Sequence, residues 1–511
     1  METAWSTASR VCGLCALSVG VATVTWLGIS SARKRGSAAK RKRRREEAGA
    51  KSKGSFCALV GNTPLVKLEE VSKDLGIELF GKAEFLNPGG SVKDRVAVKI
   101  IEVAEEQGKL KKGGTIFEGT SGSTGISLAL AGNCKGYKTV IFVPNDQAKE
   151  KIQTLEAIGA EVRLCDTVGI VDEEHFVNAA RREAQRLDPR GEGIALFSNQ
   201  FENLANCLAH IEGTGEEIWE QTGGDVDFFV SGAGTGGTIA GVALCLKKKK
   251  MKSSERVATV RGGWFKRVFG GWKKKESAEG QKKKVNDDVG VILSDPQGSA
   301  LAGRVRTGTL FNPWDKEGHR KRISVDTIVE GIGLNRLTAN FQLGLPLIDH
   351  AFSVSDREAV AISRYLVLKE GLFLGSSAAV NVAAVVKGVK TGVIPPGSRV
   401  VTILCDSGVR HLSKLYSVPF LQSRKDAIWP VQPVSSSSSS SSGAQPRASV
   451  SVGLETQRES QSQTAVKPVS NEKVAAVAHN RKADKEASDV DSLQHLLETP
   501  LFDLVEGTDR C

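Results

Sequence analysis

Lys93 has the sequence context of a reactive amine. It follows the turn formed by Asn87–Ser91 in the stretch NPGGSVKDRVA. Apolar residues then recur at a helical period, at Val96, Ile100, Val103 and Ala104. Because Ser91 and Asp94 fit a capping box, we expect Lys93 in the first turn of a helix. The positive end of a helix dipole disfavours a cation, so an amine held there has reason to be neutral and nucleophilic. A lone lysine in this pattern would more often be a solvated surface residue, and its surroundings must decide.

Two glycine-rich turns supply groups that bind anions. The first, EGTSGSTGIS, separates an expected strand at 115–118 from a helix beginning near Ile126, and it carries hydroxyls at Thr120, Ser121, Ser123 and Thr124. The second, VSGAGTGGTIAG, follows an expected strand at 227–230, and it contains Gly232, Gly234, Thr235, Gly236, Gly237 and Thr238. Hydroxyls and backbone N–H groups at a helix N-terminus are suited to a carboxylate or phosphate.

The second turn also matches GxGxxG through Gly232, Gly234 and Gly237. A dinucleotide site of that type uses an acidic ribose ligand about 20 residues further on. This chain has lysines there, at 247–250 and 252. A phosphorylated dinucleotide is therefore the alternative ligand for this turn.

The elements around these turns indicate an α/β fold. From about residue 56 to residue 420, short β-branched runs alternate with helical patterns, as in TVIFVP at 139–144 followed by a helix through Leu155. Such alternation predicts parallel sheets. A chain of 511 residues, 40% hydrophobic and 25% charged, can bury a core of about two lobes.

The N-terminal region predicts a membrane anchor. After a short segment, 1–10, residues 11–31 carry no charge and are long enough to cross ~30 Å of hydrocarbon as a helix. The linker 32–55 that follows contains the basic runs RKR and KRKRRR, so the rest of the chain should face the cytosol. A weak anchor with basic flanks is typical of the mitochondrial outer membrane, and the endoplasmic reticulum is the alternative.

Two further segments depart from globular composition. The insertion 247–288 holds 15 Lys or Arg against 5 Asp or Glu around a group of aromatic residues, which suits an anionic lipid surface or a disordered basic loop. It resembles no nucleic-acid-binding module. The tail 421–511 includes an eight-serine run and should be disordered. Its last apolar residues could form a short amphipathic helix for a partner: Leu493, Leu496, Leu497, Leu501, Leu504 and Val505.

The cysteines argue against a disulfide framework and against a metal site. There are nine, an odd number, scattered without metal-ligand spacing, which indicates a reducing compartment. The pair Cys12 and Cys15 forms CxxC only inside the apolar segment. The net charge of +12 reflects local basic runs, which indicate patches facing an anionic surface.

Taken in order, the motifs resemble the pyridoxal-phosphate enzymes of the cysteine synthase (O-acetylserine sulfhydrylase) and cystathionine β-synthase group, of fold type II. The resemblance covers nearly all of residues 56–420, interrupted by the insertion. Its landmarks are GNTPLVKL at Gly61, NPGGSVKDR at Asn87, EGTSGSTGIS at Glu118, GAEV at Gly159, NQFENLAN at Asn199, TGEEIW at Thr214, SGAGTGGT at Ser231, DPQGS at Asp295, EGIG at Glu330, EGLFLGSSAA at Glu370 and CDSGVRHLS at Cys405. It implies two parallel-sheet lobes with the cofactor, pyridoxal 5'-phosphate, between them.

The resemblance also implies roles for individual residues. Lys93 would form the Schiff base with the cofactor and later remove the substrate's α-proton, and Ser377 would contact the pyridine nitrogen. Ser123 stands where the family usually has an asparagine that contacts the cofactor's phenolic oxygen. The phosphate would lie on Gly234, Thr235, Gly236, Gly237 and Thr238, and the substrate carboxylate on Thr120, Ser121, Thr124 and Gln200.

The activity implied by the resemblance is β-replacement, in which O-acetyl-L-serine and sulfide give L-cysteine and acetate. The haem-binding segment and C-terminal regulatory pair of many cystathionine β-synthases have no counterpart here, which favours cysteine synthesis. The alternatives are cystathionine synthesis, cysteine desulfhydration, or a catalytically silent family member that acts as a membrane-surface interaction protein. We expect a homodimer.

Overall fold

The computed structural model describes residues 55–120, 122–147, 149–255, 288–310, 327–424, 495 and 498–505. The chain divides into two compact units, Met1–Val60 and Gly61–Cys511. In the first unit the described part contains helix α2 (Ser55–Leu59). The expected anchor at 11–31 lies outside the described residues. Within the described ranges, no helix combines the length and apolar character needed to cross a bilayer.

The second unit contains a large sheet of six strands. Its order is β1-β2-β10-β7-β8-β9, and every pairing is parallel except that of β1 with β2. These strands are rich in Val, Ile, Leu and Phe and are buried on both faces, as a parallel sheet covered by helices requires. Their bounds are β1 (Leu65–Lys67), β2 (Glu78–Ala83), β7 (Phe228–Gly232), β8 (Gly290–Pro296), β9 (His350–Val354) and β10 (Arg399–Leu404).

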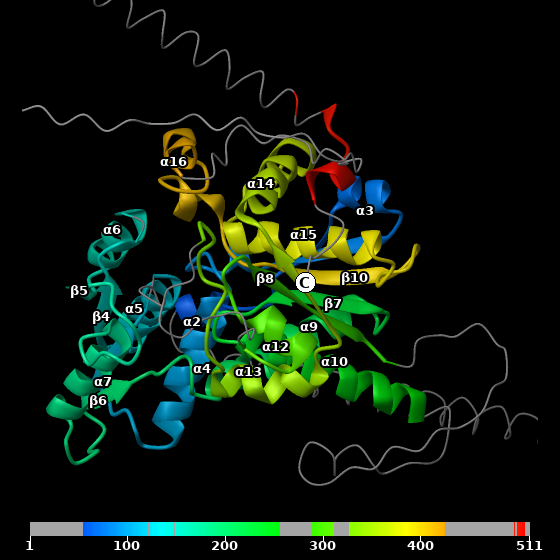
Figure 1. The fold of residues 1–511 in the computed structure, drawn as a ribbon. Coiled ribbons are helices and arrows are strands. Elements are labelled where there is room, and N and C mark those ends of the chain that lie inside the picture. The colour runs from blue at the N-terminus through cyan, green and yellow to red at the C-terminus, as the bar shows by residue number, and fades with distance from the viewer. Residues whose placement is uncertain are drawn as a thin grey trace, which may run out of the picture. The chain divides into compact units, whose positions relative to one another are not determined.

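Helices cover both faces of this sheet (Figure 1). One face packs against α3 (Glu69–Leu75), α14 (Asp356–Glu370) and α15 (Ser376–Lys390) through one apolar cluster. The other face packs against α9 (Gly215–Gln221), α10 (Gly237–Glu255), α12 (Leu301–Thr307) and α13 (Ala339–Gly344) through a second cluster. Helix α14 begins with a capping box in which Ser355 and Glu358 satisfy each other's backbone N–H groups.

A second, four-stranded parallel sheet forms the smaller lobe. Its order is β5-β4-β3-β6, with β3 (Thr115–Gly119), β4 (Lys138–Pro144), β5 (Glu161–Cys165) and β6 (Ala195–Phe197). Helices α5 (Ser123–Lys135) and α6 (Lys149–Ala157) cover one face, and α7 (Phe176–Leu187) covers the other. The prediction of two parallel-sheet lobes is therefore confirmed.

Helix α4 (Lys93–Glu106) joins the lobes, since it contacts both α5 and α8 (Ala205–Ala209). The expected capping box at its start is absent, because Val92 is the N-cap residue and makes no side-chain cap. Asp94 instead accepts hydrogen bonds from Gly89 N at 2.6 Å and Ser127 Oγ at 2.5 Å. The remaining elements are α16 (Val418–Ser423), a π-helix at His210–Thr214, and 3-10 turns at Glu84–Leu86, Leu345–Leu347, Gly408–His411 and Leu501–Leu504.

Two segments of unusual composition are described only in part. The basic insertion begins inside α10, which continues to Glu255, and residues 256–287 lie outside the described part. Most of the tail, residues 425–494, also lies outside it. The final 3-10 turn, η6 (Leu501–Leu504), packs against this chain's own apolar core, where we had expected a helix for a partner.

Candidate active site

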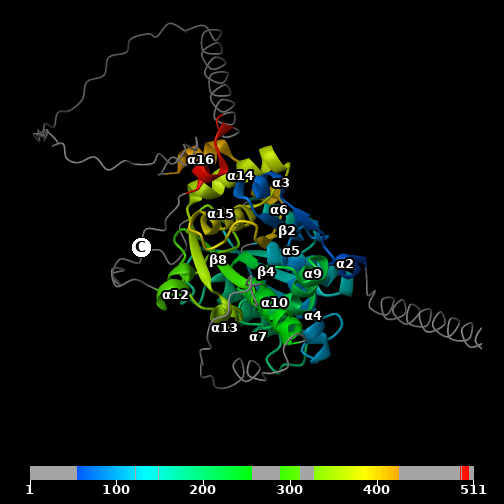
Figure 2. The same cartoon turned by 90° about the vertical axis from the view of Figure 1, so that its right-hand side faces the viewer.

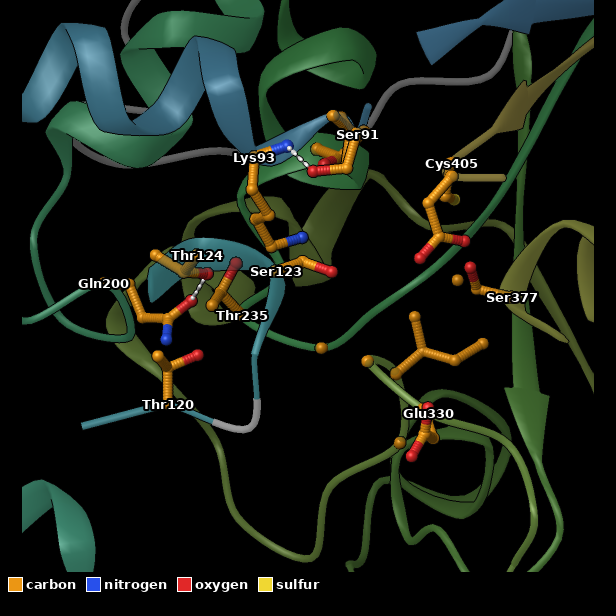
Figure 3. A pocket seen from close by; sticks show the side chains of 18 of the residues that line it. Ser91, Lys93, Thr120, Ser123, Thr124, Gln200, Thr235, Glu330, Ser377 and Cys405 are labelled. Carbon is orange, nitrogen blue, oxygen red and sulfur yellow. Dashed lines mark hydrogen bonds between the residues drawn. The ribbon is translucent and has the colours of Figure 1, made fainter. Parts of the chain in front are cut away.

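Lys93 stands at the edge of a cavity of 230 Å³ between the two lobes. Its side chain points into the cavity, with Thr120, Thr124 and Gln200 on one side and Ser377 on the other (Figure 3). Burial lowers the pKa of the Lys93 amine, and no described residue makes a hydrogen bond or ion pair with its Nζ. The structure therefore brings the predicted nucleophile together with both predicted anion sites.

The turn from Gly232 to Thr238 lines the cavity and runs from the end of β7 into the first residues of helix α10. Its glycines are required by close backbone packing: a Cβ on Gly234 would lie 2.2 Å from the carbonyl oxygen of Gly331. A Cβ on Gly237 would lie 2.0 Å from Asn206 Oδ1. Asn206 Nδ2 also donates to Thr235 Oγ1 at 2.8 Å. The turn is thus tightly packed where it lines the cavity at the start of α10, and a helix N-terminus of this kind can cradle a phosphate.

The opposite wall is the turn between β3 and α5. Thr124 Oγ1 donates to Gln200 Oε1 at 2.6 Å, and Gln200 Nε2 donates to Glu118 Oε1 at 3.3 Å. Glu118 also accepts from the hydroxyl of Ser198. Burial raises the pKa of Glu118 to about 7, although the hydrogen bonds from Ser198 and Gln200 oppose the shift. Thr120 lines the same wall, whereas Ser121 lies outside the described residues.

Ser123, the departure from the family pattern, lines the cavity at the first position of α5. Its Oγ accepts a hydrogen bond from Arg410 Nη1 at 3.0 Å. Arg410 also donates to the carbonyl oxygen of Gly89, in the turn before Lys93. The Ser123 hydroxyl is therefore fixed by a cation from the other lobe.

A buried charge network at the cavity was not identified from the sequence. Lys151 of α6 reaches across the cavity to Glu330, with Nζ 2.5 Å from Oε2. Glu330 also pairs with Lys414 at 3.0 Å and with His411 Nδ1 at 3.3 Å, and His411 Nε2 lies 3.1 Å from Asp406 Oδ2. Burial disfavours both charged forms, yet the pairing raises the pKa of His411 and lowers that of Glu330. The motifs EGIG and CDSGVRHLS contain three of these residues, but only the fold brings them together.

The aliphatic stem of Lys151 also supports the wall formed by the turn between β3 and α5. Gly122 has a φ of +137°, and a Cβ there would lie 2.5 Å from Lys151 Cδ. The turn thus rests on the methylene groups of Lys151, whose ammonium is tied to Glu330. Glu330 N in turn donates to Ser376 Oγ at 3.0 Å, next to Ser377.

These residues fit pyridoxal phosphate. The partly buried amine of Lys93 could form an imine, the glycine-rich turn could hold a phosphate, and the hydroxyl of Ser377 at the N-terminus of α15 could bind the ring nitrogen. Among the described residues, no cluster of His, Cys, Asp and Glu could hold a metal ion.

The fold and this site define a pyridoxal-phosphate-dependent enzyme, and comparison with known families agrees. The family model described as pyridoxal-phosphate dependent enzyme matches residues 57–406, and the chain belongs to this family. That match includes the GxGxxG turn, and the cofactor of the family is pyridoxal phosphate and not a dinucleotide.

Within the family, similar curated proteins are cysteine synthases. Cysteine synthase 2 of Schizosaccharomyces pombe is 45% identical, with 74% of this chain and 86% of the relative covered. The putative mitochondrial cysteine synthase of Saccharomyces cerevisiae is 44% identical, with coverage of 70% and 82%. A similar solved structure is the O-acetylserine dependent cystathionine beta-synthase of Helicobacter pylori, at 29% identity and a TM-score of 0.54, with coverage of 70% and 97%.

Proposed function

We propose that this enzyme makes L-cysteine and acetate from O-acetyl-L-serine and sulfide. The observation that carries the proposal is the position of the Lys93 amine. It lies in one cavity between the glycine-rich turn that starts α10 and the wall that contains Thr120 and Gln200. The names of these two curated relatives support the same reaction.

The residues of the cavity have distinct tasks in this reaction. Lys93, the glycine cradle and Ser377 would hold pyridoxal phosphate, which when bound supplies the electron sink that stabilises negative charge at the substrate's α-carbon. Thr120, Thr124 and Gln200 would bind the substrate carboxylate and orient the Cα–H bond. Lys93 Nζ, which burial keeps from being strongly basic, would take the α-proton.

Replacing Lys93 tests this assignment most directly. We expect Lys93→Ala to lose turnover and the absorbance band of the lysine-bound cofactor, because Lys151, the other described amine of the cavity, is paired with Glu330. Lys99→Ala, on the exposed side of the same helix, is the matched control and should keep both. Retention of the band and of turnover in Lys93→Ala would refute the assignment.

A panel of substrates separates the proposed reaction from its alternatives. We expect sulfide with O-acetylserine to give the highest kcat/KM among sulfide, homocysteine and cysteine as sulfur substrates. Faster reaction with homocysteine would indicate cystathionine synthesis, and rapid sulfide release from cysteine would indicate desulfhydration. Cofactor binding with no turnover would favour the silent interaction protein.

We also propose that residues 11–31 anchor the enzyme in the mitochondrial outer membrane, with the catalytic body facing the cytosol and forming a homodimer. The uncharged run followed by basic residues supports the anchor, and the name of the Saccharomyces cerevisiae relative supports the mitochondrion. Protease added to intact mitochondria should digest the body. Protection of the catalytic body until the membrane is broken would contradict the cytosol-facing topology. Recovery of the protein with the endoplasmic reticulum would change the assigned organelle. Light scattering of the purified protein tests whether it is a dimer.

A further inference from the structure

The C-terminal turn η6 packs on an apolar surface of the large lobe formed by α3, α14 and α15, which we call the groove. Leu501, Leu504 and Val505 are 1%, 4% and 0% exposed, and they join the apolar cluster of helices α3, α14 and α15. Figures 1 and 2 both show the turn, in red, beside α3 and α14. Leu501 and Leu504, three residues apart, lie on one face of the 3-10 turn, and Val505 follows it in extended conformation.

One cation of the groove recognises the backbone of the segment. Lys390, the last residue of α15, donates from Nζ to the carbonyl oxygen of Val505 at 2.5 Å, and its ammonium lies 5.8 Å from the ring centroid of Phe502. Asp503 adds a favourable charge near the same ammonium. The segment contributes a single turn and no strand, so apolar burial dominates its binding.

For a contact of this size, the free energy gained by docking is close to the free energy that ordering the segment costs. Burial of three aliphatic side chains favours docking, whereas ordering the backbone around them opposes it. The chain between Arg424 and His495 joins the segment to the body, and such joining gives an effective concentration on the order of millimolar. A weak contact is therefore occupied within one chain even though a free peptide of the same sequence would bind only modestly.

We propose that the groove on α3, α14 and α15 is a peptide-binding surface, and that the chain's own segment Thr499–Val505 is its resident, exchangeable ligand. The groove selects a short peptide with aliphatic residues at the positions of Leu501, Leu504 and Val505, and with an acidic residue that can approach Lys390. Pro500, which precedes the turn, fixes the backbone at the entrance of the segment.

The groove is distant from the catalytic residues. Helix α15 has 15 residues and carries Ser377 at the cavity end and Lys390 at the groove end, which at ~1.5 Å per residue are about 20 Å apart. Exchange of the segment can therefore occur without contact with the cofactor or the substrate.

The test opens the groove in the full-length enzyme. Leu504→Asp places a charge in the apolar contact and should release the segment, and a fluorescein-labelled peptide of residues 495–507 should then bind the variant. Wild-type enzyme should bind the peptide about tenfold more weakly, because its own segment competes at a millimolar effective concentration. Leu187→Asp, at a site 42% exposed on α7, is the matched control and should behave like wild type.

A second change identifies the groove as the binding surface. Lys390→Met in the Leu504→Asp background should weaken peptide binding, because it removes the donor to Val505 while keeping an apolar stem. Absence of peptide binding to Leu504→Asp, or binding unaffected by Lys390→Met, would overturn the proposal. So would loss of the cofactor absorbance band in Leu504→Asp, which would make the segment a part of the core. A wild-type dimer that dissociates on Leu504→Asp would assign the segment to a second copy.

Discussion

The two glycine-rich turns of the cavity, to which we assign the cofactor phosphate and the substrate, are built on different principles. The phosphate turn is held by close packing around its glycines, with Gly234 against the carbonyl oxygen of Gly331 and Gly237 against the side chain of Asn206. The substrate turn is held by networks that contain ionisable side chains, with Glu118 bonded to Gln200 on one side and Lys151 paired with Glu330 on the other. A cofactor that stays bound suits the first construction, and a substrate that must enter and leave suits the second. Substitutions and pH should therefore act on the two turns in different ways.

The largest effect is expected from Gly234→Ala. Its Cβ would meet the carbonyl oxygen of Gly331 at 2.2 Å, and a backbone atom cannot rotate away. Overpacking of this kind costs about 1–3 kcal/mol, so cofactor affinity should fall on the order of 10- to 100-fold. Gly303→Ala, where the nearest atom is 3.7 Å away, should leave affinity unchanged in the same cofactor titration. Equal affinities would show that the phosphate turn adapts, and the contrast with the substrate turn would fail.

A smaller effect, on the substrate turn, is expected from Lys151→Met. The substitution keeps the apolar stem under Gly122 but removes the ion pair with Glu330, which retains His411 and Lys414. Loss of one charged hydrogen bond is worth about 1.5 kcal/mol, so the dissociation constant for L-cysteine should rise roughly tenfold with cofactor affinity unchanged.

Lys414→Met is the matched control for that change. Lys414 pairs with the same carboxylate, but it should hold the substrate turn less firmly. Its side chain is 22% exposed, and the side chain packed under Gly122 is that of Lys151. We expect it to change the dissociation constant for L-cysteine less than Lys151→Met does. Equal effects would mean that the charge of Glu330, and not the position of the turn, governs binding.

The substrate turn should also respond to pH through Glu118. Its pKa of about 7 lies above the ordinary value of 4.5, so the folded protein favours the protonated form and the associated stability is lost as pH rises from about 4.5 to about 7. In the structure Gln200 Nε2 donates to Glu118, so a protonated Glu118 that donated to the Gln200 carbonyl oxygen instead would turn Nε2 toward the cavity. Acetate should therefore bind about three- to tenfold more tightly at pH 6 than at pH 8. Glu118→Gln should give a flat profile, and a profile equal to wild type would assign the titration to another group.

The smallest effect is expected from Ser123→Asn. If the serine hydroxyl, held by Arg410, does not reach the cofactor oxygen, asparagine restores a hydrogen bond worth ~0.5–1.5 kcal/mol. Turnover should rise about a few-fold to tenfold, and the cofactor spectrum should shift while affinity changes little. An unchanged rate and spectrum would mean that Arg410 and the turn already supply the contact. A lower rate would mean that Ser123 is adapted to a bulkier substrate.

The sequence predicted the parts of this site whose chemistry is local. Lys93 follows a Pro-Gly-Gly turn and begins a helix, and each glycine-rich turn joins a strand to a helix. Composition and residue spacing along the chain are therefore enough to identify them as candidate site residues. The charge network could not be predicted in this way, because Lys151, Glu330, Asp406 and His411 come from three separate segments that meet only in the folded chain. The aliphatic spacing at the end of the tail was visible, but the groove that receives it is assembled from three helices. The prediction of a capping box was wrong because the Asp94 carboxylate accepts hydrogen bonds from Gly89 N and Ser127 Oγ instead.

The strand order of the large sheet has a consequence for synthesis of the protein. Among the described strands, β2 pairs with β1 on one edge and with β10 on the other. The second edge of β2 therefore stays unpaired until β10, which ends at residue 404, has been synthesised. At ~5–20 residues per second, this wait lasts roughly 15–60 s after β2 is made. The small sheet, by contrast, lies within residues 115–197 and can form early. The nascent large lobe therefore exposes an unpaired strand during translation, and chaperone binding and ribosome pausing should affect yield there first.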